Sequence, residues 1–266
     1  MSRWAAGVEY LGTAYAGFQR QSHAPSVQQE LETALARVAN APLGIHAAGR
    51  TDAGVHALGQ VVHFDSDASR TADNWLMGAN THLPDDIALR WLQPVNPDFH
   101  ARHSARARSY RYLIAQGRGR SPLLQGRAAQ LQQQLDVSAM RIAGNCLLGE
   151  LDFSAFRAAE CQSRTAMRCV QALQISASKQ FVSIDIRANA FLHHMVRNIV
   201  GSLILVGRGQ CSPSWLEQVL AGRDRSAAGP TAPACGLYFV AAHYGPEHGL
   251  PEPVQPWLPF ATGEMN

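Results

Sequence analysis

An arginine and an aspartate lie between two glycines in the short segment Gly49 to Ala57, which reads GRTDAGVHA. Arg50 and Asp52 are two residues apart in it. An ionised aspartate can act as a nucleophile, and a guanidinium close to it lowers the carboxyl pKa by roughly 1–3 units. Asp52 equally suits an Asx turn, since aspartate before Ala-Gly is common in turns. The segment has neither the Gly-Lys-Ser/Thr of a phosphate loop nor the H-E-x-x-H of a zinc helix.

A third charged residue, Arg197, lies in a strongly apolar stretch. Phe191 to Val206 predicts a long helix whose other residues are mainly aliphatic. A guanidinium among such residues is costly unless it is paired. Arg197 is therefore expected either to pair with a carboxylate or to reach water along a narrow polar face shared with His193 or His194. The two histidines themselves are expected to be structural.

The basic residues are unevenly distributed. Lys179 is the only lysine among 23 basic residues, and the net charge is +3. No Asp or Glu occurs between Phe99 and Leu135, a stretch that holds seven arginines: Arg102, Arg106, Arg108, Arg111, Arg118, Arg120 and Arg127. Arginine suits phosphate because its planar fork binds oxygens in pairs. The stretch favours an anionic partner, nucleic acid first, over the alternative of a solvated basic face.

The elements that must position these residues follow from hydrophobic periodicity. Ser26 and Gln29 form a capping-box pattern before a helix that ends near Pro42. Alternation predicts strands around Val8 and Tyr10 and at 109–115, where Tyr110, Tyr112 and Ile114 share one face. The other expected strands are 45–48, 60–64, 88–92, a hairpin of 169–175 with 181–187, and 237–242. The other expected helices are 73–81, 138–148 with a Ser138 cap, and 214–220.

These elements predict an α+β fold of two ferredoxin-like halves with antiparallel sheets and a central cleft for the site. The expected boundaries are 1–105 for the half with the Asp52 loop, 106–245 for the second half, and 246–266 for an extended tail. The composition, 46% hydrophobic and 16% charged, is that of globular proteins. Five cysteines without a C-x-x-C pair argue against a disulfide framework or a zinc site. No signal-peptide pattern and no membrane-spanning run is visible, so a cytoplasmic protein is expected.

The GRTDAGVHA segment resembles the most distinctive motif of the tRNA pseudouridine synthase A family. Further blocks resemble the same family in the same order, and together they cover residues 3 to about 245. One departure is Leu11-Gly12, where the family usually has Asp-Gly. The blocks are Glu9-Tyr10, Ala16 to Gln21, Ser26 to Gln28, Phe99 to Arg102, Ser109 to Tyr112, Cys161 to Thr165, Asn189 to Asn198 and Gly236 to Tyr238.

The resemblance implies a role for each matching residue. Asp52 resembles the nucleophile, Arg50 the arginine that helps displace the target nucleotide, Tyr110 the tyrosine that packs on the target base, and Arg197 the partner of the catalytic carboxylate. Further positions resemble tRNA contacts: Arg70, Phe99, His100, Ala101, Arg102, His103, Glu160, Cys161, Gln162, Ser163 and Arg164.

The resemblance also implies the reaction. Uridines at positions 38, 39 and 40 of the tRNA anticodon stem-loop are isomerised to pseudouridine by a homodimer that uses no cofactor and no catalytic metal. Two alternatives have different consequences. A non-catalytic tRNA chaperone would keep the arginines and Tyr110 but tolerate changes at Asp52. A metal-dependent nuclease would need clustered ligands, which the sequence does not display.

Overall fold

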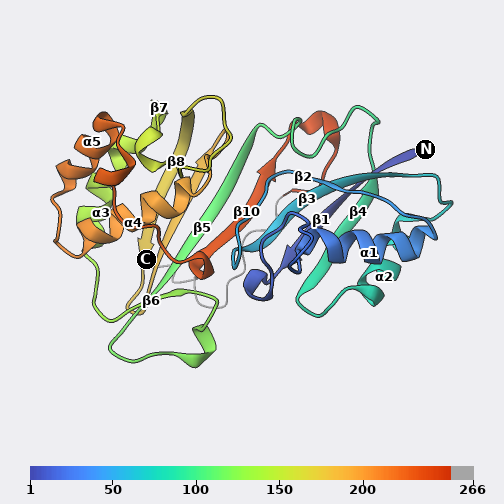
Figure 1. Ribbon diagram of the computed structural model, residues 1–266, viewed down its shortest axis with the longest axis horizontal. Helices are drawn as coiled ribbons and strands as arrows, with labels where there is room; N and C mark the ends of the chain where they lie inside the picture. Colours follow the sequence, from blue (N-terminus) through green and yellow to red (C-terminus); the bar gives the residue numbers. More distant parts are fainter. Residues whose placement is uncertain (253–266) are drawn as a thin grey trace. The chain divides into compact units, whose positions relative to one another are not determined.

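The computed structural model describes residues 1–252 (Figure 1), which form two compact units. The first unit contains Met1–Arg106 and residues 238–252, and the second contains Ala107–Leu237. The chain therefore leaves the first unit after Arg106 and returns to it at Tyr238. The expected boundaries assigned residues 238–245 to the second half. Periodicity reveals a strand there, but it carries no information about the neighbour with which the strand pairs.

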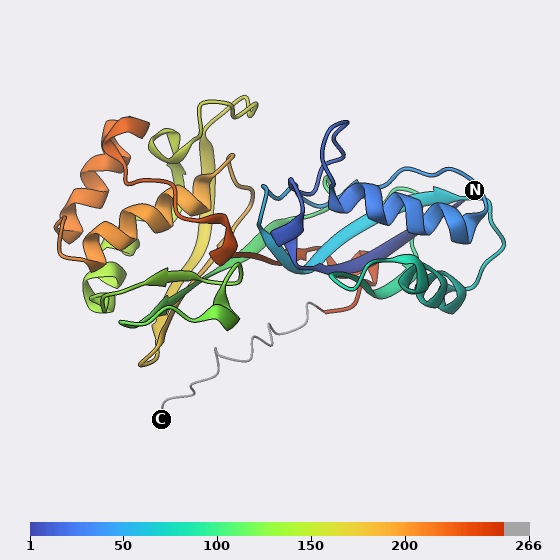
Figure 2. The same ribbon diagram turned by 60° about the horizontal axis from the view of Figure 1, so that its bottom comes forward.

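The first unit is a sheet with two helices. The strands lie in the order β4-β1-β3-β10, and β1 is antiparallel to both β3 and β4. β10 runs parallel to β3, and a short β2 pairs with the other end of β3. Helices α1 and α2 pack against each other (Figure 2). The bounds are β1 Ser2–Tyr10, β2 His46–Ala47, β3 His56–Ser66, β4 Ile87–Pro94, β10 Leu237–His243, α1 Val27–Ala39 and α2 Ala72–His82.

Capping and burial explain why these helices form where they do. The Ser26 side chain accepts a hydrogen bond from the Gln29 amide at 3.4 Å, which confirms the predicted cap of α1. Thr71 and Asn74 form a reciprocal capping box at the start of α2. The apolar side of α1 is buried, with Leu31 and Leu35 fully covered, and Trp75 of α2 is buried as well. The helices thus cover the sheet that carries the Asp52 loop at the start of β3.

The second unit is a sheet of order β5-β9-β8-β7 with antiparallel neighbours, while the short β6 runs parallel to β5. Its helices α3, α4 and α5 pack on one another. The bounds are β5 Ala107–Gln116, β6 Ala129–Leu131, β7 Gly149–Asp152, β8 Met167–Ala177, β9 Phe181–Ala188, α3 Val137–Gly144, α4 Met195–Gly207 and α5 Pro213–Gly222. The predicted α+β class is confirmed.

Two helix starts differ from the prediction. α4 begins at Met195 rather than Phe191, because His194 has a φ of 60° and a left-handed residue cannot continue a right-handed helix. α3 is capped by Asp136, whose side chain accepts from the Ala139 amide at 2.9 Å, and not by Ser138. The remaining helical turns are 3₁₀: Gly12–Ala14, Pro122–Leu124, Asn145–Leu147, Ser154–Phe156, Arg225–Ala227, Ala234–Gly236 and Pro246–His248.

The first residues of the expected tail are folded onto the first unit. Glu247 forms an ion pair with Arg106 at 2.7 Å, and the Gln93 side chain donates to the Gly249 carbonyl at 2.9 Å. The His248 ring lies 5.2 Å from that of Phe99. Residues 253–266 of the expected tail lie outside the described residues. Among the described helices, none has the length and apolar character needed to cross a membrane.

Candidate active site

The Asp52 loop connects β2 to β3 and is fixed by backbone contacts with the segment after β1. The Phe18 amide donates to the Thr51 carbonyl at 3.0 Å, and the Gly54 amide donates to the Tyr15 carbonyl at 3.4 Å. The hydroxyls of Thr51 and Tyr10 are 2.8 Å apart, and burial raises the pKa of Tyr10 to about 12. Tyr10 therefore stays neutral and anchors the residue next to Asp52.

Two glycines let this neighbouring segment approach the loop. A Cβ on Gly12 would lie 1.9 Å from the Val55 carbonyl oxygen, and one on Gly17 would lie 2.8 Å from the Thr51 carbonyl oxygen. Gly17 also has a φ of 110°, a conformation that favours glycine. The Gly12 amide donates to Nδ1 of the buried His56 at 2.9 Å. Both glycines are therefore required for the observed path of the loop.

Asp52 itself is half-buried, and Arg50 is exposed. The turn that follows is closed by the Asp52 backbone, because the Val55 amide donates to the Asp52 carbonyl at 3.1 Å. Gly54 occupies the left-handed position of that turn with a φ of 76°. The hydrogen bond that closes this turn therefore involves the backbone carbonyl of Asp52 and not its side chain.

Tyr110 and Phe191 form an aromatic pair in the second unit. Their ring centroids are 5.0 Å apart, and the planes are nearly perpendicular at 83°. Tyr110 is 9% exposed, whereas Tyr112 and Ile114 on the same strand are fully buried. Tyr110, Tyr112 and Ile114 lie two residues apart on β5 and so share one face of the strand, and Tyr110 is the one of the three that keeps some access to the surface.

Arg197 is half-buried in the first turn of α4 and is tied to the segment before β10. Its Nε donates to the Ala232 carbonyl at 2.8 Å, and the Ala232 amide donates to the Arg197 carbonyl at 3.1 Å. Burial raises the pKa of the Cys235 thiol, and the Arg197 charge opposes this rise. The guanidinium is thus held near Cys235 with its Nε occupied.

Two arginines, Arg157 and Arg168, stabilise the loop at 160–164 by hydrogen bonds to its backbone and to a side chain. Arg157 donates to the carbonyls of Cys161 and Ser163 at 2.7 and 2.8 Å, and Arg168 donates to the Ser163 hydroxyl at 2.5 Å. Burial raises the pKa of the Cys161 thiol, but the amides of His193 and Ser163 and the Arg157 charge outweigh it and lower the pKa. The predicted contact residues Glu160, Gln162 and Arg164 are exposed on this loop.

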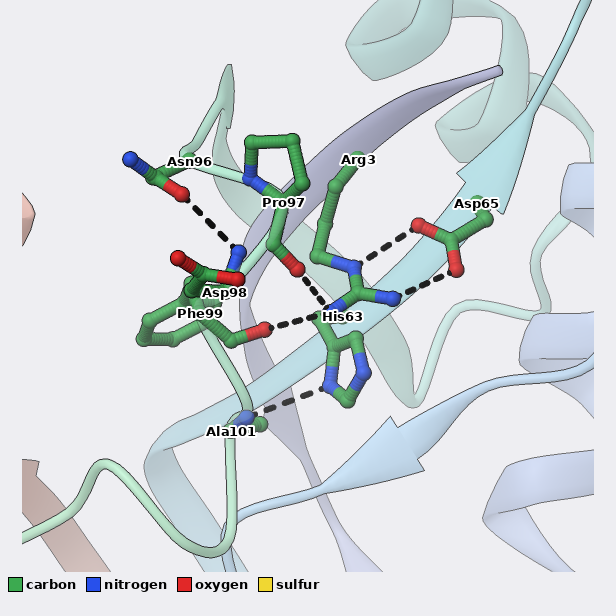
Figure 3. Close-up of polar contacts among 8 residues, drawn as sticks. All are labelled: Arg3, His63, Asp65, Asn96, Pro97, Asp98, Phe99 and Ala101. Atoms are coloured by element: carbon green, nitrogen blue, oxygen red, sulfur yellow. Dashed lines mark hydrogen bonds and ion pairs between the residues drawn. The ribbon is translucent and has the colours of Figure 1, made fainter.

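The predicted contacts at 99–103 divide into two groups. Phe99 and Ala101 are fully buried, so these side chains belong to the core of the first unit and not to its surface. His100 is half-buried, and Arg102 and His103 are exposed. Figure 3 shows the polar contacts that hold this turn.

Arg70, also a predicted contact, is exposed just before α2, and its Nε donates to the Val38 carbonyl at 3.1 Å. Arg70 thereby links the end of α1 to the start of α2.

The arginine-rich stretch is partly used inside the protein. Arg106 pairs with Glu247 and Arg111 with Asp185, each at 2.7 Å, and Arg108 donates to the Asn189 carbonyl at 3.0 Å. Arg118 and Arg120 are exposed in the loop between β5 and β6. Three of the seven arginines are therefore engaged within the protein, two by carboxylates and one by a backbone carbonyl, and they contribute less to the expected anionic-partner surface.

Four residues that support the predicted contacts were missed in the sequence: Arg3, His63, Arg157 and Arg168. Arg168 is 8% exposed, and its Nε is buried without a hydrogen-bond partner. A polar residue at an inward position of an expected strand is a signal that was available for His63, whereas Arg168 lies just before the strand expected at 169–175. Within either unit taken alone, the described residues include no group of three His, Cys, Asp or Glu arranged to hold a metal ion.

Known proteins similar to this chain identify its family. A family model of tRNA pseudouridine synthases matches residues 6–104 and 143–245. The tRNA pseudouridine synthase A of Aeromonas hydrophila subsp. hydrophila is 54% identical over 259 residues, which are 97% of this chain and 96% of that protein. Its counterpart in Hydrogenovibrio crunogenus is 52% identical over 254 residues, 96% of this chain and 97% of its own. The solved archaeal box H/ACA sRNP Nop10-Cbf5 complex aligns with a TM-score of 0.38 and 14% identity over 91% of this chain and 49% of that one, too low a likeness to carry an argument. The chain belongs to the tRNA pseudouridine synthase family.

Proposed function

We propose that this tRNA pseudouridine synthase isomerises uridines at positions 38, 39 and 40 of the anticodon stem-loop, with Asp52 as the residue that does the covalent work. The observation that carries the proposal is the Asp52 loop. Its GRTDAGVHA sequence is fixed through Thr51 and Gly54 by backbone hydrogen bonds to the segment after β1. A rigid loop can hold a carboxylate in one position for reaction.

The chemistry needs one ionised carboxylate and no redox group. The bond between uracil N1 and ribose C1′ breaks, the base turns, and a bond from C5 to C1′ forms. N1 gains a proton and C5 loses one, so the net composition does not change. Attack of Asp52 on the ribose, attack on the base and removal of a ribose proton are three routes to this result, and each requires the carboxylate form. We assign to Arg197, as the resemblance of its motif implies, the role of electrostatic partner of the catalytic carboxylate.

A stacked uridine must leave the helix before a carboxylate can reach it. Flipping costs a few kcal/mol, and stacking on an aromatic side chain returns about 1–3 kcal/mol per base. We assign the receiving face to Tyr110, which the Phe191 ring supports in a T-shaped contact, and the displacement of the nucleotide to the exposed Arg50. Arg70, Arg102, Arg164 and their neighbouring loop residues are assigned to the tRNA backbone, which positions the substrate without reading its sequence.

Two further assignments complete the proposal. The enzyme acts as a homodimer, as the resemblance of its motifs to the family implies, and it works in the cytoplasm, where its proposed tRNA substrate is found.

The proposed positions can be tested by mapping the product. Purified protein is incubated with a tRNA transcript that carries uridine at positions 38, 39 and 40 and at control positions elsewhere in the stem-loops. We expect pseudouridine at the three anticodon-arm positions and at no other uridine. Modification confined to another arm of the tRNA would contradict the assignment, even though it would leave the protein in its family.

Tyr110 offers a test of base stacking. The substitution Tyr110→Phe keeps the ring and is expected to retain most of kcat/KM. Tyr110→Leu removes the ring and is expected to lower kcat/KM about 5- to 150-fold, which corresponds to a loss of about 1–3 kcal/mol of stacking. Steady-state kinetics on the same transcript measures both variants. Equal losses in the two variants would assign the role to the hydroxyl instead of the ring.

A further inference from the structure

The guanidinium of Arg3, on β1, makes hydrogen bonds that hold the turn at residues 96–103 (Figure 3). Nε and Nη2 of Arg3 donate to the two carboxylate oxygens of Asp65 at 2.8 and 2.7 Å. Nη1 of the same guanidinium donates to the Pro97 carbonyl and, at 3.0 Å, to the Phe99 carbonyl. Such a bidentate pair fixes the plane of the guanidinium, so its remaining donor is aimed at the turn. Arg3 and Asp65 thus set the position of the start of the turn.

A buried imidazole holds the other half of the turn. His63 on β3 is 2% exposed, and its Nδ1 accepts a hydrogen bond from the Ala101 amide at 3.1 Å. This contact requires that Nδ1 carries no proton. The same arrangement recurs within the turn itself, where Nδ1 of His100 accepts a hydrogen bond from the Arg102 amide at 3.1 Å. The backbone that carries Arg102 and His103 is therefore tied to unprotonated imidazole nitrogens.

The surroundings of His63 disfavour a proton on it. The His46 ring of β2 stacks on His63 at 5.0 Å, and the His100 ring lies 4.6 Å away. The Arg3 cation on β1 adds to the repulsion, and the Asp65 carboxylate on β3 opposes it. Burial, His100, His46 and Arg3 together lower the pKa of His63 to about 4. Burial, and then the charges of His103, His46 and Arg3, lower the pKa of His100 as well.

We propose that Arg3, Asp65 and His63 are positioning residues that hold the 96–103 turn in the shape that presents His100, Arg102 and His103 to tRNA, and that a proton on His63 releases this hold. The inference rests on the proposed function for the identity of the RNA. It adds a regulatory property, a loss of tRNA affinity in acid, that arises from a side chain which does not itself touch the substrate.

The sign and size of the effect follow from linkage. Because the pKa of His63 is lowered when the turn is held, neutral His63 stabilises the held turn at pH values above the ordinary histidine pKa of 6.5. This stabilisation is lost as the pH falls from 6.5 toward 4. At pH 5.0 the ratio of held to released turn falls by up to about 30-fold relative to pH 7.5, because pH 5.0 lies about 1.5 units below the ordinary histidine pKa of 6.5 and each unit is a factor of ten.

The experiment compares variants that differ in whether residue 63 accepts a hydrogen bond and whether it titrates. His63→Asn places an amide oxygen near the position of Nδ1 and cannot be protonated in this range. His63→Phe removes the acceptor at every pH. His82→Asn changes an exposed histidine at the end of α2 and is the matched control. For each protein, the Kd for tRNA is measured by filter binding between pH 5.0 and 7.5, together with KM and kcat.

We expect the Kd of the wild type to rise at least fivefold more than that of His63→Asn when the pH is lowered from 7.5 to 5.0. His82→Asn should follow the wild type. His63→Phe should raise Kd and KM already at pH 7.5, while kcat stays nearly unchanged. For His63→Asn, Kd and KM at pH 7.5 should lie much closer to the wild-type values. The comparison isolates residue 63, because the 96–103 turn has the same sequence in all of these proteins.

Identical pH profiles for the wild type and His63→Asn would overturn the inference. If His63→Phe does not fold, His63→Asn still decides the question, and Arg3→Lys provides a second test. The lysine can pair with Asp65 but cannot also reach both carbonyls, so KM should rise at every pH, and an unchanged KM would count against the hold. A wild type that binds tRNA but forms no pseudouridine would refute the proposed function, while the affinity profiles would still test the turn.

Discussion

Replacing Asp52 with asparagine is expected to lower kcat for pseudouridine formation by about a thousandfold or more, a size typical for the loss of a covalent catalytic group. The amide has nearly the same shape as the carboxylate but carries no charge and is a poor nucleophile. Because the bond that closes the following turn uses the Asp52 backbone carbonyl, the loop should keep its path. The Kd for tRNA should therefore stay within about twofold of the wild type, well under the tenfold that 1.4 kcal/mol represents.

The control for this change is Asp85→Asn, which alters an exposed aspartate between α2 and β4. Its kcat should match that of the wild type, and the melting temperatures of both variants should show whether the fold is intact. An Asp52→Asn protein that retains a tenth of the wild-type kcat would refute the catalytic assignment. Retained activity would also revive the chaperone alternative, in which the carboxylate is dispensable.

Gly12→Ala is expected to have the second large effect, although Gly12 has no side chain to take part in the reaction. The added methyl carbon would lie 1.9 Å from the Val55 carbonyl oxygen, and this neighbour is backbone and cannot rotate away. Either the 12–18 segment or the Asp52 loop must move. Overpacking of this kind typically costs about 1–3 kcal/mol of stability. Since a misplacement of about 1 Å can cost about a hundredfold in rate, kcat should fall far more than this loss of stability suggests.

Thermal unfolding and initial rates separate the two consequences of Gly12→Ala. The matched control is Gly44→Ala in the same unit, where the new Cβ would make only an ordinary contact at 3.9 Å with Glu32. The control should melt and react like the wild type. If Gly12→Ala were stable and fully active, the close approach of the two segments would not be what positions Asp52.

Much of the fold could be predicted because its elements are locally encoded. Ser26 with Gln29 and the buried face of Leu31 and Leu35 predicted α1, and alternation at Tyr110 and Tyr112 predicted β5. Errors arose where a single backbone conformation overrides periodicity. The left-handed His194 moves the start of α4 to Met195, even though Phe191 and Leu192 extend the apolar pattern of the helix toward the N-terminus.

The candidate site was predictable only where a motif marks it. Asp52 and Arg50 stand in the GRTDAGVHA segment, but nothing near Arg3 or His63 in the sequence links them to residues 97–101, which follow more than 30 positions later. Their contacts depend on the register between β1 and β3, which places Arg3 opposite Asp65. The burial of Phe99 and Ala101 was missed for a similar reason, since an irregular turn has no period from which burial can be inferred.

The parallel pairing of β10 with β3 has a consequence for biosynthesis. Tyr238 and Phe239 lie beside His56 and Ala57, directly after the Asp52 loop. A ribosome must therefore translate the whole of the second unit before the strand that flanks the loop emerges. Nascent chains shorter than about 238 residues would carry the Asp52 carboxylate, the proposed catalytic group, on an incomplete sheet. Catalytic competence should thus appear late in synthesis, after the second unit has had time to fold.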